Sequence, residues 1–273
     1  MHIVKRLRSA FWGAFQHGQF SIAKAGAYSS ILTLFPALLV IASLLEASRD
    51  TDALLRQIAN AVGWALPPGS NSIAMSYFHG TRPFPTNRIL FSAVTVTLLA
   101  ATGVMISWME GFRKAYGMAN TWGFWRERMR ALFLVLLALL PMAFATFLVV
   151  FGNQVEALVK HDTILRPVVQ FFWKLGRWAI AITTSTTCMA LIYHHGMPRT
   201  QTWRHILPGA IMATFFWFPA TIIFGWYVTN YANYSAVYGS LGAAIALLVW
   251  LYILSVIVLL GAEFNAQLYP RNI

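Results

Sequence analysis

Six long apolar stretches, separated by polar segments, are the feature that most constrains how this chain can fold. A helix needs about 20 residues to cross a hydrocarbon core about 30 Å thick. Of the 273 residues 58% are hydrophobic, and the mean hydropathy is +0.61. We therefore predict an all-α, polytopic membrane protein with a single transmembrane domain over residues 1–273. Its six predicted spans are 22–45, 89–109, 131–151, 178–193, 206–228 and 241–262.

Proline and hydroxyl residues interrupt some of these spans. Pro36, Pro141 and Pro219 lie inside the first, third and fifth spans, and each leaves a backbone carbonyl one turn earlier without its helical donor. In lipid that carbonyl needs another partner, so a packing kink and a broken helix lining a pathway both fit. The fourth span is short, and its hydroxyl run 183–187 is expected to pack against neighbouring helices.

Two loops are expected to contain amphipathic helices. Residues 52–62 place apolar side chains at helical spacing, and residues 155–172 show a looser version of the same pattern. Such helices lie in the headgroup plane or cap a helical bundle.

The chain is strongly basic, with a formal net charge of +12. A basic chain can bind nucleic acid, but in a membrane protein Lys and Arg hold loops at the cytoplasmic face and attract anionic lipids. The positive-inside rule places both termini in the cytoplasm. We therefore expect anionic membrane lipids as partners and no nucleic acid. The densest basic loop follows the second span and contains Arg113, Lys114, Arg126, Arg128 and Arg130.

Chemistry-bearing groups are scarce at membrane depth. Lys24, Glu110 and Glu263 fall near span ends, where charged side chains can reach the interface. No carboxylate or histidine lies at the middle of a predicted span, which argues against a proton relay or an ion-coupled site built on buried carboxylates. The single cysteine, Cys188, excludes an intrachain disulfide, and Ser240 would need a base beside it to act as a nucleophile. We expect no catalytic residue, no metal and no cofactor, and hence no enzyme.

The candidate substrate or lipid site combines the basic loop with two further groups. Glu263, followed by Asn265, is the best single candidate for a buried polar contact, although an interfacial role fits equally well. An Asn and Tyr cluster before the sixth span fits either a site or a membrane-surface anchor. The remaining candidates are Tyr28, Pro36, Asn230, Tyr231, Asn233, Tyr234 and Tyr238.

Several motifs resemble those of one family. Residues 27–36 (AYSSILTLFP) resemble the first-helix signature of the YihY/virulence factor BrkB family, and 238–243 (YGSLGA) and 261–266 (GAEFNA) resemble its sixth helix. The resemblance covers essentially the whole chain. It implies a six-helix bacterial inner-membrane protein, from a family in which some members were formerly and mistakenly labelled ribonuclease BN. It also implies transport or lipid export as the usual proposal.

Two functions therefore stay open. The first is a transporter or flippase-like protein for a lipid or another amphipathic envelope component. The alternative is a membrane scaffold or assembly factor that transports nothing. The substrate, the direction, the energy coupling, the protein partners and the formation of a homo-oligomer are not readable from the sequence.

Overall fold

The computed structural model describes residues 2–46, 87–119, 121–139, 141, 166–199, 201–230 and 241–269. Within these ranges the regular structure is entirely helical and includes no strand, which confirms the all-α prediction. One helix covers residues 124–139. The others are α1 (His2–Gln16), α2 (Gln19–Glu46), α5 (Asn87–Ala115), α7 (Arg166–His195), α8 (Trp203–Asn230) and α10 (Leu241–Leu268).

Four of the described helices are long and apolar enough to cross a membrane, so the chain is a multi-pass membrane protein. They contain the spans Gln19–Val40, Leu90–Ala115, Trp203–Val228 and Ala244–Leu268. These match the first, second, fifth and sixth predicted spans. The fourth predicted span lies within α7, and the third, 131–151, lies partly outside the described residues. The total of six transmembrane helices therefore stays a prediction.

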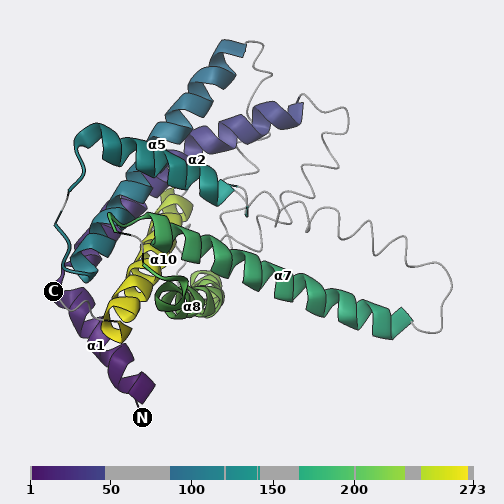
Figure 1. Cartoon of the computed structure of the whole chain (residues 1–273). Helices are drawn as coiled ribbons and strands as arrows, with labels where there is room; N and C mark the ends of the chain where they lie inside the picture. The colour runs from purple at the N-terminus through teal and green to yellow at the C-terminus, as the bar shows by residue number, and fades with distance from the viewer. Residues whose placement is uncertain are drawn as a thin grey trace.

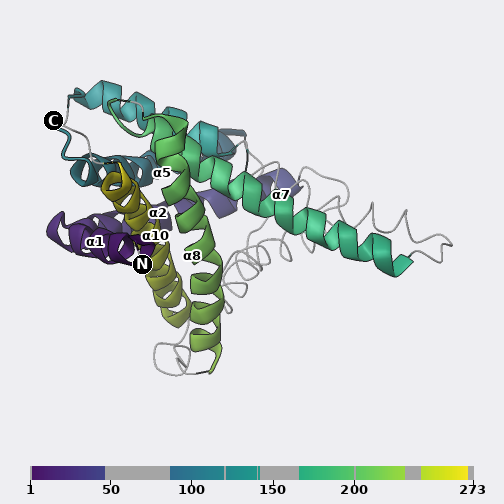
Figure 2. The same ribbon diagram turned by 60° about the horizontal axis from the view of Figure 1, so that its bottom comes forward.

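Helix α10 is the centre of the bundle. It packs against α1, α2, α5 and α8, while α2 and α5 lie side by side along much of their length (Figure 1). Helix α7 packs mainly on α8, and its N-terminal half projects away from the other labelled helices in both views (Figure 1 and Figure 2). This arrangement gathers the end of α5, the end of α7, the start of α8 and the end of α10 in one place.

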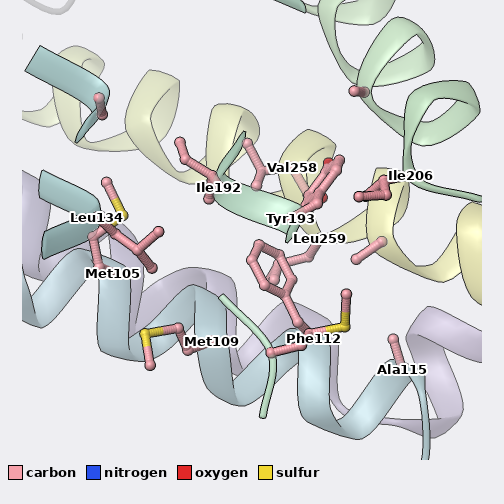
Figure 3. Packing of buried hydrophobic residues seen from close by; sticks show 14 of the residues in the cluster. Met105, Met109, Phe112, Ala115, Leu134, Ile192, Tyr193, Ile206, Val258 and Leu259 are labelled. Atoms are coloured by element: carbon pink, nitrogen blue, oxygen red, sulfur yellow. The ribbon is translucent and has the colours of Figure 1, made fainter. Parts of the chain in front are cut away.

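The main core lies at that meeting point (Figure 3). Phe112 of α5 and Tyr193 of α7 are fully buried, and their rings meet edge to face with centroids 5.1 Å apart. The Tyr193 hydroxyl donates a hydrogen bond of 2.6 Å to the carbonyl of Val258 on α10. A buried tyrosine needs such a partner for its hydroxyl, so this bond fixes α7 against α10.

Helices α8 and α10 cross in close contact. Gly209 and Gly261 face each other at the crossing, where a Cβ on Gly209 would overlap the Gly261 carbonyl oxygen. Small residues allow helices in a membrane to approach so closely. Asn265 reinforces the crossing: its Oδ1 accepts the Gly209 N–H at 2.7 Å, and its Nδ2 donates to the Ile206 carbonyl at 2.9 Å.

The predicted kinks and loop helices have mixed outcomes. Helix α2 continues through Pro36 and α8 through Pro219, so neither helix is broken at its proline. The neighbours of Pro141 lie outside the described residues. So do the predicted loop helix at 52–62 and residues 155–165 of the second one, whereas residues 166–172 form the start of α7.

Candidate functional site

The centre of the candidate site is Glu263, which is fully buried near the end of α10. Its Oε1 lies 2.8 Å from Nδ1 of His17 and accepts a hydrogen bond of 2.8 Å from Nε2 of Gln19. The prediction of a buried polar contact at Glu263 is confirmed. The carboxylate does not reach solvent, because α1 folds back over the end of α10 and covers it. Lys24 and Glu110, also predicted near span ends, are exposed and half-exposed.

Small residues on α1 allow this covering contact. Ala10, Gly13 and Ala14 are buried against the rest of the bundle. A Cβ on Gly13 would lie 3.0 Å from Oε2 of Glu263, so the α1 backbone passes directly over the carboxylate. Gly18 then turns the chain with a positive φ of 68°, a conformation that glycine adopts without steric cost.

Gln19 links this site to α5. Its Nε2 donates a second hydrogen bond, of 2.9 Å, to the Gly111 carbonyl, so a single amide group joins α2, α5 and α10. Both Oε1 of Gln19 and Oε2 of Glu263 are buried acceptors without a hydrogen-bond partner in the described part of the chain. The cluster therefore contains two buried acceptor oxygens that receive no hydrogen bond from the described residues. Leaving such oxygens unpaired costs free energy in a low-dielectric interior.

His17 connects the cluster to the surface. Its side chain retains 38% of its accessible area, whereas that of Glu263 retains none. With the carboxylate ionised, Nδ1 carries the hydrogen and donates to Oε1. The contact therefore joins a buried carboxylate to an imidazole that is reachable from outside.

The five basic candidates were predicted in one loop, but the structure places them on two helices, with Arg113 and Lys114 in the last turn of α5. Arg113 is buried, and its guanidinium lies 2.7 Å from Oε1 of Glu127. Lys114 is half-exposed and pairs with Glu110 one turn earlier at 3.0 Å. Both side chains already have protein partners, and only Lys114 lies at the surface.

The other three basic candidates lie on the helix over 124–139. Arg128 is partly buried and donates a hydrogen bond of 3.0 Å to the Thr102 hydroxyl. Arg130 is exposed, with its guanidinium 4.5 Å from the centre of the Trp122 ring, and Arg126 is also exposed. Their exposed apolar neighbours on this helix are Phe124, Trp125, Met129 and Phe133.

The remaining candidates do not join the Glu263 cluster. Tyr28 is exposed and Pro36 is partly buried, both on α2. Asn230 is exposed at the end of α8, where its Nδ2 bonds the Trp226 carbonyl. Asn265 serves the α8–α10 crossing. Tyr231, Asn233, Tyr234 and Tyr238 lie outside the described residues.

The sequence reasoning missed α1 and therefore His17. The available signal was the spacing of Ala10, Gly13 and Ala14, which places small residues on one helical face ahead of a His–Gly pair. The described residues also contain no group of three or more His, Cys, Asp or Glu side chains that could hold a metal ion.

The long apolar helices and the buried polar cluster define the class: a multi-pass, all-helical membrane protein. The chain belongs to the virulence factor BrkB family, whose sequence profile matches residues 11–272. This match confirms the family resemblance. No solved structure matches the chain.

Two relatives align with nearly the whole chain. The putative ribonuclease-like protein YfkH of Bacillus subtilis (strain 168) is 27% identical over 273 residues, covering 100% of this chain and 97% of that protein. A UPF0761 membrane protein of Aeromonas salmonicida (strain A449) is 25% identical over 94% of this chain and 87% of its own length. A third, the UPF0761 membrane protein XAC0937 of Xanthomonas axonopodis pv. citri (strain 306), is 34% identical over 101 residues, covering 37% of this chain and 23% of that protein.

Proposed function

We propose that this protein is a bacterial inner-membrane transporter of the flippase type, which moves a lipid or another amphipathic envelope component. The observation that carries the proposal is the exposed pair Arg126 and Arg130 on a helix that also exposes large apolar side chains. Guanidinium groups bind phosphate with two parallel hydrogen bonds, and neighbouring aromatic rings suit the headgroup region. This surface fits an anionic lipid with a phosphate headgroup.

In this proposal the chain crosses the membrane six times, with both termini in the cytoplasm. The two crossings beyond the four apolar spans come from α7 and from the segment that begins with the helix over 124–139. Helix α1 supports the orientation. It exposes Phe11, Trp12 and Phe15 together with the basic side chains of Lys5 and Arg8, a composition suited to the anionic cytoplasmic leaflet.

The proposal assigns no enzymatic reaction to the protein. A buried carboxylate beside a histidine could assist proton transfer in an enzyme. Covalent catalysis, however, also needs a nucleophile within hydrogen-bond reach of the histidine. The described partners of Glu263 are an imidazole and the amide of Gln19. Ser240 lies outside the described residues, and the ribonuclease-like name belongs to the Bacillus relative.

The test is lipid movement in liposomes that contain purified protein and a labelled anionic phospholipid. Wild type is expected to move the label between leaflets faster than protein-free vesicles. Each basic residue near an anionic surface is worth about 1 kcal/mol, so Arg126→Gln with Arg130→Gln is expected to slow movement by about tenfold or more.

Two matched variants sharpen this test. Arg126→Lys with Arg130→Lys keeps the charge and should retain part of the rate, whereas Lys24→Gln removes an exposed charge from another helix and should leave the rate unchanged. Equal rates for wild type and empty vesicles would contradict transport. The protein would then fit the scaffold alternative, in which the same basic and aromatic surface binds lipid without moving it.

A further inference from the structure

We propose that Glu263 and His17 form a proton-binding site that couples a proton gradient to the transport proposed above. The inference has two parts, and the second, the coupling to transport, rests on that proposed function. The first part, the proton site, rests on geometry alone: a fully buried carboxylate, a half-exposed imidazole 2.8 Å away, and a carboxylate oxygen without a partner among the described residues.

The surroundings of the carboxylate select a proton over a larger cation. Oε2 of Glu263 faces the backbone of Gly13, where even one added carbon atom would lie only 3.0 Å away. Hard cations such as Ca²⁺ need six or more oxygen ligands, and the described contacts of this carboxylate come from nitrogen donors. A proton needs no such shell, and it neutralises a charge that is costly to bury.

His17 provides the route from water to the buried carboxylate. A proton from water binds the second ring nitrogen of His17, which makes the imidazole cationic. The proton on Nδ1 then moves along the 2.8 Å contact to Oε1 of Glu263. The imidazole is neutral again, the carboxyl group is neutral, and one proton has entered the site; release reverses the same steps.

Protonation at this point affects four structural elements at once. The charged carboxylate attracts the His17 ring in the α1–α2 turn and the Gln19 amide, which in turn holds the Gly111 carbonyl of α5. A neutral carboxyl group loses much of this attraction, because hydrogen bonds to charged groups are about twice as strong as neutral ones. The position of α1 and α2 against α10 therefore depends on the proton.

Other charged groups on the surrounding helices have partners of their own or lie at the surface. Arg6 donates to the Leu268 carbonyl, Glu110 pairs with Lys114, and Arg113 pairs with Glu127. His205 of α8 stacks on Tyr269, and Tyr193 of α7 bonds Val258. The exposed groups on these helices are Lys5, Arg8, Lys24 and Arg204. Among the described contacts, His17 is the titratable group that touches the Glu263 carboxylate.

The experiment measures movement of a labelled anionic phospholipid in liposomes with and without an imposed difference of about one pH unit. One pH unit corresponds to a tenfold driving force per coupled proton. With the gradient in one direction, wild type is expected to move the label several-fold faster than without a gradient. The upper limit of this increase is about tenfold for one coupled proton. Glu263→Gln and His17→Gln are expected to lose this difference.

Glu110→Gln is the matched control, because it removes a half-exposed carboxylate of α5 that pairs with Lys114 and not with His17. It should keep the full gradient dependence. Lipid movement by wild type that ignores the gradient would overturn the coupling while leaving the proposed transport intact. Gradient dependence that survives in a folded Glu263→Gln variant would overturn the role of this site.

A second measurement decides the proton site even if no lipid moves. Infrared difference spectra of wild type, recorded between about pH 5 and 8 where histidine titrates, should show a carboxyl C=O band that appears on acidification. Glu263→Gln should lack that band, and Glu110→Gln should retain it. If wild type and Glu263→Gln give the same spectra, Glu263 does not take up a proton and the inference fails.

Discussion

Nδ1 of His17 lies 2.8 Å from Oε1 of Glu263, although 246 residues separate the two in the chain. This contact joins the turn between the first two helices to the end of the last one. It is part of a buried polar cluster at a place where α1, α2, α5 and α10 meet. The fold therefore brings the beginning and the end of the chain together around one carboxylate.

Substitution at the α8–α10 crossing is expected to disrupt the bundle. In Gly209→Ala the new methyl group would overlap the Gly261 carbonyl, which is backbone and cannot rotate away. We expect a loss of about 1–3 kcal/mol in the free energy of unfolding, as for other overpacked sites, measured in detergent by denaturant titration. The control is Gly176→Ala on α7, where a Cβ would meet nothing within 4 Å. A Gly209→Ala protein as stable as the Gly176→Ala protein would contradict the close crossing.

Two neighbouring basic residues should differ sharply in their contribution to stability. Removing Arg113 leaves Glu127 without its partner in a largely buried pair, a change that typically costs about 3–5 kcal/mol. Removing Lys114 breaks a half-exposed pair worth about 0–1 kcal/mol. The check is the thermal transition of Arg113→Ala and Lys114→Ala in the same detergent. Similar transitions for the two variants would argue against the buried position of Arg113.

A pH effect is expected at His195, the last residue of α7. Burial lowers the pKa of His195 below its ordinary value of 6.5, and His194 and Arg130 lower it further. The unfolded chain therefore binds this proton more readily, so the histidine destabilises the fold as pH falls below about 6.5. His195→Asn should show a smaller drop in thermal stability between about pH 8 and 5.5 than wild type shows. An equal drop in both proteins would contradict the prediction.

Hydropathy predicted four of the described helices closely, because α2, α5, α8 and α10 each contain an apolar window bounded by polar residues. It was less successful for α7. The predicted span 178–193 is only the C-terminal part of a helix that begins at Arg166. Lys174 and Arg177 lower the local hydropathy without ending the helix, so the sequence pattern underestimated its length.

The candidate site was harder to predict, because burial there depends on contacts between distant parts of the chain. Glu263 lies near the end of an apolar stretch, where a carboxylate ordinarily reaches water. It is buried because α1, His17 and Gln19 pack against it. Arg113 and Arg126 belong to the same basic loop in sequence, yet one is buried and the other exposed. The difference depends on which side of its helix each arginine occupies and on the pairing of Arg113 with Glu127. Counting the charges in the loop predicts neither.

A double-mutant cycle between His17 and Glu263 tests the central claim most directly. The free energies of unfolding of wild type, His17→Gln, Glu263→Gln and the double variant are compared in the same detergent. If the two side chains interact as the structure shows, the single effects should not add, and the coupling energy should be about 1–3 kcal/mol. Effects that add to within about 0.3–0.5 kcal/mol would mean that His17 and Glu263 do not interact, and the proposed site would be contradicted.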